Sequence, residues 1–590
     1  MDSIASCAVE GVLYTVMGFR SGELITVLFD RHGKQSAHSD KLSGTVTRVL
    51  TGTEPGEEPV VLVTSDSELS LMTNFEVPGF DDPSIAKTKH RIWPVDMKDP
   101  KLPCPPVDSV TVLPRHLLSE NDGTVPLLLV SGPTLLITEL QLQPGPAHRH
   151  IPVDGTPDRI LYSHRLKCLI VALRKGTQPS RTTLAFIDPD TGEDIGVPSD
   201  KHGNIYEYAR GLGKPDDKVM AMAEWEYKKD GHVWHFLIIG MYKERLMVMS
   251  AEREKEAPEG KQPRLRYWTR FQKKGLERPV YAVLGHGEQL IYCTRECIQW
   301  EVIDAVDKKL REVDKYELAS PGTTLMMVNG RLAVLCNNHS VEIVERSATT
   351  GNGEGSESAQ LIHSDPKDLN PFHMIEVSGS PGNEPSSSLI LVSDRFCGVV
   401  GLWTPWQSPG RDCETVFTAE LPASIRRFAR GRTRPLWSAR KPRYGRIAMT
   451  VDDSEILGVC LDGSLVEFQL LSMEAWRLMR FILNLAMMDE VINPFNNITL
   501  DDVKHFEPEP SPSPDTMHID GDELQRCVEK GALERLMALP GHMNRFKELL
   551  DEIEDGRLTD RIKSRADEDK DAGYFTLAYT ILYYFLAPAL

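Results

Sequence analysis

The sequence lacks the short motifs that mark most enzyme classes. It contains no GxSxG, no HExxH, no Walker loop and no GxGxxG after a predicted strand. RGLGKPDD (210–217) is rich in glycine, but its spacing differs from that of a phosphate-binding loop. We therefore expect no catalytic residues and no enzyme activity.

Paired cysteines are also missing. The ten cysteines are scattered without a CxxC pair, which is typical of reduced thiols in a cytosolic or nuclear protein. Cys293 and Cys297 lie in a strand context, and His148 and His150 lie in a proline-flanked loop. Because neither pair has two further ligands nearby, we expect no metal and no cofactor. No basic start followed by an apolar core opens the chain, so we expect no signal peptide.

What is present is an ordinary globular composition with an acidic balance. The 590 residues are 41% hydrophobic and 26% charged, and this length predicts two to four domains. The net charge of −19 argues against a surface that binds nucleic acid throughout, although a local patch can still be basic.

Short apolar strands alternate with tight polar turns up to about residue 471. Examples are VLYTVMGFRSGELITVLF (12–29), VVLVTSDSELSLM (60–72), LMMVNGRLAVL (325–335) and ILGVCLDGSLVEFQL (456–470). Asn329-Gly330 is the sharpest turn signal, since a type I′ hairpin needs positive φ at both central positions. The long irregular spacing of these hairpins predicts a mainly β protein built of propeller blades. A pair of large β-sandwich domains is the alternative.

The architecture changes after Ser472. Apolar residues recur at helical spacing over 472–491, with Ser472 as the expected N-cap. A proline-rich linker, FEPEPSPSPDTM (506–517), then precedes helical segments expected at about 522–539 and 542–554. These features predict a small all-α domain at the C-terminal end.

Within that domain, HIDGDELQRCVEKG (518–531) raises the question of a metal or acid/base site. With Gly521 in its sixth position, an EF-hand loop would end at Cys527, where a carboxylate is required. We interpret the stretch instead as a helix start, in which Gly521 makes the turn and Asp522 or Asp520 accepts backbone N–H groups.

The same stretch resembles a known family. IDGDEL (519–524) is similar to the Ile-Asp-Gly-Asp-Leu signature in the C-terminal helical domain of the large subunit of damaged-DNA-binding protein (the cullin-4 adaptor), the A subunit of cleavage and polyadenylation specificity factor and the third subunit of splicing factor three-b. CLDGSLVEFQLLS (460–472) and VMGFRSGELITVLFDRHGKQ (16–35) resemble strands of that family in the same order. The matching motif residues, with a structural role, are Trp476, Asn493, Pro494, Phe495, Ile519, Asp520, Gly521, Asp522 and Leu524. Glu523 departs from the Leu that the family prefers.

The resemblance implies a domain plan in which the chain is the second half of a protein with three seven-bladed propellers. Residues 1–95 would be terminal strands of the second propeller, 105–405 the complete third propeller, and 415–471 strands that close the first. Residues 472–555 would be the helical domain, followed by a tail at 556–590. Because incomplete propellers leave unpaired edges, we expect either that a second chain supplies the missing blades or that the chain is a partial gene product.

The tail ends in the apolar run GYFTLAYTILYYFLAPAL (573–590). A membrane anchor, a packed helix and a terminus foreign to the fold are the alternatives. The run is marginal in length for spanning a bilayer, and we expect no membrane attachment.

One segment is strongly basic. IRRFARGRTRPLWSARKPRYGR (425–446) combines arginines, which fork around phosphates, with aromatic faces on which bases or side chains stack. The candidate residues for binding nucleic acid or an acidic partner are Arg426, Arg427, Arg430, Arg432, Arg434, Trp437, Arg440, Lys441, Arg443, Tyr444 and Arg446. The alternative is a solvated loop whose charges balance an acidic neighbour.

These features predict a nuclear scaffold of WD40-like β-propellers that binds protein partners and nucleic acid. By the resemblance, it would be an adaptor of ubiquitin ligation and DNA repair with cullin-type ligase subunits as partners. One alternative is a scaffold of mRNA processing that binds cleavage, polyadenylation or splicing subunits. An alternative of another class is a propeller enzyme with its site at the channel mouth.

Overall fold

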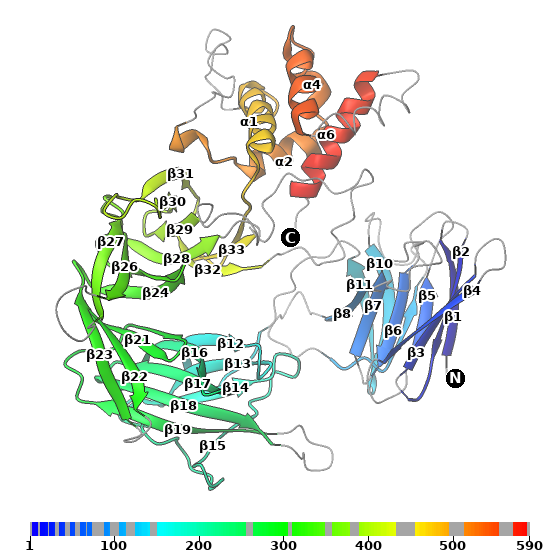
Figure 1. The fold of residues 1–590 in the computed structure, drawn as a ribbon. Helices are drawn as coiled ribbons and strands as arrows, with labels where there is room; N and C mark the ends of the chain where they lie inside the picture. Colours follow the sequence, from blue (N-terminus) through cyan, green and yellow to red (C-terminus); the bar gives the residue numbers. More distant parts are fainter. Residues whose placement is uncertain are drawn as a thin grey trace. The chain divides into compact units, whose positions relative to one another are not determined.

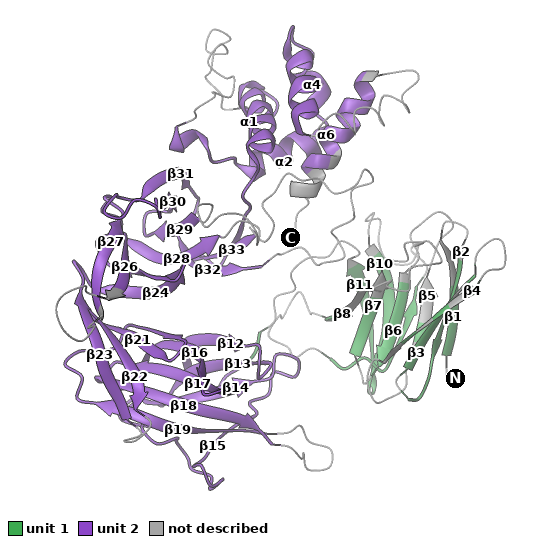
Figure 2. Cartoon of the chain, in the orientation of Figure 1, with its two compact units in different colours: residues 1–151, 433–446, 587–590 green, residues 152–432, 447–586 purple. Residues whose placement is uncertain are grey.

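The computed structural model of the chain contains two compact units (Figures 1 and 2). Unit 1 comprises the described part of Met1–Ile151, and unit 2 that of Pro152–Arg432 and Ile447–Leu586. The structure describes residues 3–586 except 10–11, 22, 30–34, 42–47, 53–59, 66–67, 74–87, 95–104, 114–123, 142–149, 255–263, 305–308, 349–356, 378–388, 432–454, 495–512 and 554–569. Small antiparallel sheets dominate the described residues, which confirms the mainly β class.

Unit 1 contains three antiparallel sheets in its described part. They are β1 (Ser3–Val9), β2 (Val12–Gly18), β3 (Glu23–Phe29) and β4 (Gln35–Lys41); β5 (Arg48–Gly52), β6 (Val60–Ser65), β7 (Glu68–Thr73) and β8 (Thr88–Ile92); and β9 (Ser109–Val112), β10 (Thr124–Ser131) and β11 (Thr134–Gln141). Leu62 and Leu69 of the second sheet share a core with Val110 and Leu127 of the third. Because of this core, the third sheet belongs to the same compact unit as the second. The propeller boundary that the resemblance implied between residues 95 and 105 stays a prediction.

Unit 2 continues with six sheets among its described residues, each formed by strands that follow one another in the chain. The first three contain β12 (Thr156–Ser163), β13 (Cys168–Lys175) and β14 (Arg181–Ile187); β16 (Val219–Lys229), β17 (His232–Met241), β18 (Arg245–Arg253) and β19 (Leu265–Lys274), with β15 (Gly196–Pro198) parallel to β19; and β20 (Ala282–His286), β21 (Gln289–Thr294), β22 (Cys297–Asp304) and β23 (Lys309–Glu317). The other three contain β24 (Gly322–Val328), β25 (Arg331–Cys336), β26 (Val341–Ala348) and β27 (Glu357–Ser364); β28 (Pro371–Val377), β29 (Leu389–Asp394), β30 (Gly398–Trp403) and β31 (Glu414–Glu420); and β32 (Ile425–Arg430), β33 (Ile456–Cys460) and β34 (Leu465–Phe468).

The β24–β25 turn and the pairing of β31 can be compared with what the sequence predicts. The β24–β25 turn has φ of 48° at Asn329 and 77° at Gly330, the positive values that the Asn-Gly signal predicts. Strand β31 pairs with β30, with Thr415 opposite Leu402. The expected boundary between residues 405 and 415 therefore lies within one sheet, because β31 completes the sheet that β28 begins.

The first strands of consecutive sheets pack against one another along unit 2, in the order β12, β16, β20, β24, β28 and β32 (Figure 1). Apolar side chains fill the space between neighbouring sheets. Trp225 and Val248 pack with Tyr292 between the second and third sheets, and Val377 packs with Ile425 between the last two. Each sheet that lies between two others is thus covered on both faces by its neighbours.

The sheets also repeat two β-bulges at matching places. Pairing between the first and second strands skips one residue of the first strand in five of the six sheets described in unit 2. The skipped residues are Asp158, Met220, Thr323, Phe372 and Arg426. Pairing between the third and fourth strands likewise skips Arg270, Val313, Ile362 and Val416 of the fourth strand. A bulge bends its strand and redirects a side chain. Because the bulges recur at matching places, the sheets repeat one structural pattern.

A helical bundle follows the last sheet. It contains α1 (Met473–Met488), the 3₁₀ turn η4 (Pro514–Thr516), α2 (Gly521–Glu529), α3 (Leu533–Leu536), α4 (His542–Ile553) and α6 (Lys570–Leu586). Ser472 caps α1 as expected, since its Oγ accepts the N–H of Ala475 at 3.2 Å. The helix expected over 522–539 is wrong in one respect: it breaks at Gly531, whose φ of 54° is left-handed, and resumes at Leu533.

Helix α6 contains most of the apolar tail. Leu577 and Ile581 are buried, α6 packs against α2 and α4, and the Tyr579 hydroxyl accepts the N–H of Leu533 at 3.1 Å. Of the alternatives for the tail, the structure shows the packed helix, so the bundle extends beyond residue 555 to Leu586. None of the described helices is long and apolar enough to cross a membrane.

The cap of α2 gives a first prediction. The Asp520 carboxylate accepts the N–H groups of Asp522 at 2.9 Å and Glu523 at 3.4 Å, so Asp520 rather than Asp522 is the N-cap. We expect Asp520→Ala to lower the unfolding free energy of the bundle by about 1 kcal/mol and Asp520→Asn to cost much less, because the amide oxygen can still accept. Urea denaturation followed by the helical circular dichroism signal measures both effects.

The matched control is Asp522→Ala, which removes a carboxylate from the first turn without removing the cap. Only its interaction with the helix dipole is lost, which is worth a few tenths of a kcal/mol at an exposed site. A larger loss for Asp522→Ala than for Asp520→Ala would contradict the capping assignment.

Candidate binding surface around β32

Strand β32 carries the described part of the basic segment. Ile425 and Phe428 are buried in the core between the last two sheets, whereas Arg426, Arg427 and Arg430 are exposed. Regular alternation would bury one of two consecutive residues. The bulge at Arg426 breaks the alternation, so that Arg426 and Arg427 both face solvent.

An aromatic ring lies beneath Arg426. Its guanidinium carbon is 5.2 Å from the ring centroid of Phe372, and that of Arg395 is 5.4 Å from the same centroid. Phe372 is the bulge residue of β28, the position that corresponds to Arg426 one sheet earlier. Arg395 comes from the β29–β30 turn, next to Phe396, whose side chain is 75% exposed. Two cations on one ring, beside an exposed second ring, form a surface for stacking and for charge.

A further arginine reaches this region from the first sheet of unit 2. Burial lowers the pKa of Arg159 on β12, and the positive charges of Arg426 and Arg427 lower it further. The three guanidiniums therefore lie within one another's electrostatic field. Asp158, beside Arg159 in the chain, opposes this effect but is already paired with Arg174 at 2.8 Å.

His373 connects β28 to β32 beneath the arginines. Burial, together with the charges of Arg427 and Arg426, lowers the pKa of His373 to about 4. The imidazole is therefore neutral at pH 7, and its Nδ1 lies 3.2 Å from the N–H of Phe428, from which it accepts a hydrogen bond. His373 thus fixes β32 in place without adding a charge to the surface, and its proton is on Nε2 because Nδ1 is the acceptor.

The arginines of β32 differ in how their charge is used. Arg430 donates to the carbonyl of Glu376 at 2.9 Å, and its charge opposes the rise that burial gives the pKa of the Glu376 carboxyl. Arg426 and Arg427 form no ion pair with any described residue. For these two, no acidic neighbour in the described part of the chain balances the charge.

The remaining candidates of the basic segment cannot be placed. Arg432, Arg434, Trp437, Arg440, Lys441, Arg443, Tyr444 and Arg446 lie outside the described residues. Sequence reasoning missed Arg159, Phe372, His373 and Arg395, which belong to the same surface. They stand singly on other strands and turns, so no local run of charge or aromatics marks them.

The family motif residues that are described have structural surroundings. Trp476 is buried in α1, and the Asn493 amide donates to the carbonyl of Met487 at 3.4 Å just beyond that helix. A Cβ on Gly521 would lie 3.4 Å from the Leu586 side chain of α6. Ile519 is half-buried, Leu524 is buried, and Pro494 is exposed, while Phe495 lies outside the described residues.

The described residues contain no group of three His, Cys, Asp or Glu side chains that could hold a metal ion. Cys293 lies in β21, one residue before its end at Thr294, and Cys297 begins β22 after a two-residue turn, so Cys293 pairs with Ile298 and Cys297 with Thr294. Cys293 is fully buried and burial raises its pKa, which favours the interpretation as a core thiol. His150 is exposed and His148 lies outside the described part.

Comparison with known proteins adds no relatives. No protein-family model matches the chain, and no curated protein matches it. The resemblance to the damaged-DNA-binding and RNA-processing subunits therefore stays a prediction from sequence motifs.

The lowered pKa of His373 predicts how the unfolding free energy depends on pH. Below about pH 6.5 an unfolded histidine binds a proton, whereas His373 in the folded protein does so only near pH 4. Stability should therefore fall by up to roughly 3 kcal/mol as the pH drops through this window. We expect His373→Gln, which cannot titrate, to reduce the pH dependence of the unfolding free energy, measured by urea denaturation at several pH values.

The exposed His202 supplies the control, because His202→Gln removes a histidine outside this environment. Its pH dependence should match that of the unchanged protein. An unchanged pH dependence in His373→Gln would show that the burial of this imidazole does not affect stability.

Proposed function

We propose that the protein is a non-enzymatic scaffold of β-propeller units, and that the surface around β32 binds the phosphate backbone of a nucleic acid. The observation that carries this proposal is the set of arginines at Arg159, Arg395, Arg426 and Arg427. Arg395 and Arg426 lie over the Phe372 ring, and the charges of Arg426 and Arg427 act on Arg159. No described residue forms an ion pair with Arg426 or Arg427. Guanidinium forks bind phosphates, and exposed rings stack on bases.

The propeller assignment is supported by how the sheets of unit 2 succeed one another. Each sheet is an antiparallel meander whose first strand packs on the first strand of the next, as the inner strands of neighbouring blades do. A β-sandwich would instead pack two sheets face to face. The field that Arg426 of the last sheet exerts on Arg159 of the first favours a ring over an open row.

The surroundings of His373 favour binding over catalysis. A channel-mouth enzyme needs titratable groups held with free access to a substrate. His373 is half-buried, and its Nδ1 accepts the backbone N–H of Phe428. Among the described residues, Arg395, Phe396, Arg426 and Arg427 are exposed groups of this surface and supply charge and stacking. The half-buried Glu376 lies in the field of the Arg430 charge.

Within the resembled family, we propose an adaptor of nuclear ubiquitin ligation and DNA repair, with an RNA-processing scaffold as the second candidate. The direct passage from the last sheet into α1 and the Asp520-capped start of α2 support membership. Native purification followed by mass spectrometry separates the two candidates. Cullin-type ligase subunits would support the first, polyadenylation or splicing subunits the second, and recovery of neither would remove this assignment.

The β32 surface makes a prediction about salt. Log affinity for a nucleic acid falls linearly with log salt, with a slope set by the number of phosphates neutralised. We expect the double substitution Arg426→Gln and Arg427→Gln to weaken binding at low salt and to reduce that slope by about 1.5 to 2. Fluorescence anisotropy with labelled single-stranded and duplex oligonucleotides over a salt series measures the slope.

The exposed Arg181 and Arg278 provide a control with the same change in net charge. The double variant Arg181→Gln and Arg278→Gln should keep the unchanged slope. Binding without salt dependence, or equal slopes in both double variants, would refute a phosphate-binding role for β32.

A further inference from the structure

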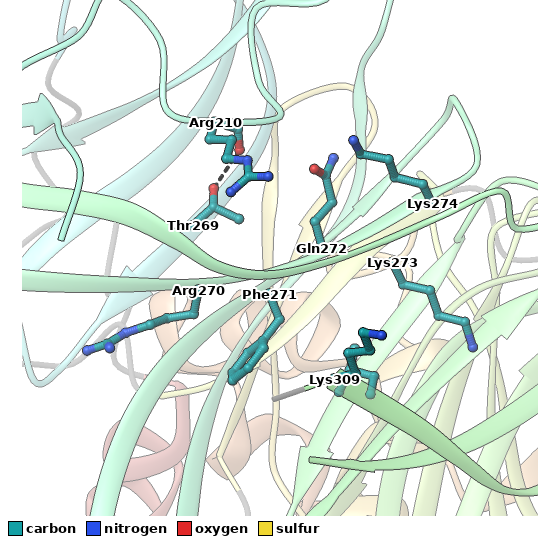
Figure 3. Close-up of a pocket in the computed structure, with 9 residues that line it drawn as sticks. Arg210, Thr269, Arg270, Phe271, Gln272, Lys273, Lys274 and Lys309 are labelled. Atoms are coloured by element: carbon teal, nitrogen blue, oxygen red, sulfur yellow. Dashed lines mark hydrogen bonds between the residues drawn. The ribbon is translucent and has the colours of Figure 1, made fainter. Parts of the chain in front are cut away.

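A second cationic site lies on unit 2, along the edge of β19. It is a pocket of about 500 Å³ whose basic lining residues are Arg210, Arg270, Lys273, Lys274 and Lys309, and none of its described lining residues is acidic. The loop before β16 supplies Arg210, β19 supplies the next three, and β23 supplies Lys309 (Figure 3). This volume lies within the range of small-molecule sites.

Two of the five basic side chains are already engaged. Lys273 pairs with the fully buried Glu301, which also accepts the hydroxyl of Tyr292 at 2.7 Å. The guanidinium carbon of Arg270, the bulge residue of β19, is 5.2 Å from the Trp268 ring, and its Nε donates to Ser250 Oγ at 2.9 Å. These contacts hold the wall of the pocket in a defined shape.

The other three basic side chains keep their charge available. Arg210, Lys274 and Lys309 form no ion pair with a described residue. Positive charge also surrounds Lys214, which is on the same loop as Arg210. The charges of Arg245, Lys274 and Lys243 lower its pKa, and Lys274 is the one of these that lines the pocket. An anion entering the pocket would relieve this repulsion.

An amide donor without a partner lies in the same wall. The Nε2 atom of Gln272 is buried, and no described group accepts from it. Gly211 brings the loop onto this amide: its φ is +98°, and a Cβ there would lie 2.9 Å from Gln272 Nε2. Strand alternation places Gln272 on the same side of β19 as Lys274, whereas Phe271 points to the other side (Figure 3).

From these observations we infer that the pocket binds a compact small molecule carrying several phosphate groups. Three uncompensated cations around one cavity require a ligand with several negative charges close together. The Gln272 amide adds a neutral donor for a phosphate oxygen. An extended acidic peptide fits less well, since its carboxylates are spaced along a chain whereas the cationic groups of the pocket surround a single cavity. The glycine-containing RGLGKPDD loop takes part as the pocket wall without having the spacing of a phosphate-binding loop motif.

The test is isothermal titration calorimetry of the full-length chain with inorganic tripolyphosphate at low salt. We expect one saturable site with a dissociation constant on the order of micromolar. The double substitution Lys274→Gln and Lys309→Gln should weaken binding about ten-fold or more, because two charge-assisted contacts are lost. The exposed Lys367 provides the control, and Lys367→Gln should leave binding unchanged.

Further arms identify the source of the phosphates and separate this site from β32. Tighter binding of ATP than of tripolyphosphate would indicate a nucleotide, and tighter binding of inositol hexakisphosphate a phosphorylated polyol; either outcome supports the pocket. Absence of saturable tripolyphosphate binding would overturn the inference. So would loss of that binding in the Arg426→Gln and Arg427→Gln variant but not in the lysine variant, or equal competition by a poly-glutamate peptide of matched charge.

Discussion

The packing of each sheet's first strand on the first strand of the next is the constraint on which unit 2 depends. It buries both faces of a sheet, so strands in the middle of a sheet are apolar without alternation. Leu290, Ile291, Tyr292 and Cys293 of β21 are consecutive and all buried. Consecutive apolar residues of this kind are needed wherever both faces of a strand are covered. A polar side chain at a strand centre then needs a partner, as Glu301 of β22 has in Lys273, whereas strand ends, turns and bulges leave polar side chains exposed.

The two bulges of the repeated sheet supply those exceptions. A bulge leaves one residue unpaired and redirects its side chain. Arg426 and Phe372 are first-strand bulge residues of neighbouring sheets. Their matching positions explain why the Arg426 guanidinium lies over the Phe372 ring. Arg270 is a fourth-strand bulge residue, and it lines the pocket beside β19. Both cationic sites thus lie where a bulge interrupts the regular sheet. Ile425, next to the bulge residue Arg426, is buried in the core and anchors the strand there.

The sequence predicted the local elements far better than their grouping. Asn329-Gly330 predicted its turn and Ser472 its cap, because each depends on backbone preferences within a few residues. The assignment of β31 to the sheet of β28 depends instead on pairing across a long connection, and no residue near 414 signals it. Gly531 is a different case. A glycine after Glu529 and Lys530 is a helix C-terminal signal, and attention to it would have predicted the break before α3.

The β32 surface and the pocket differ in ways that bear on what each can bind. Around β32 the cations are arginines, with Phe372 and Phe396 beside them and solvent in front, which suits a long partner that places phosphates and rings in succession. In the pocket, two of the three cations without an ion-pair partner among the described residues are flexible lysines around one small cavity, and the described lining contains one aromatic residue, Phe271. A net charge of −19 makes both sites selective, because an anion approaching any other part of an acidic surface is on average repelled. Local positive charge on an acidic protein therefore favours anion binding at the two proposed sites, and their shapes are the reason for proposing an extended polyanion at one and a compact polyanion at the other.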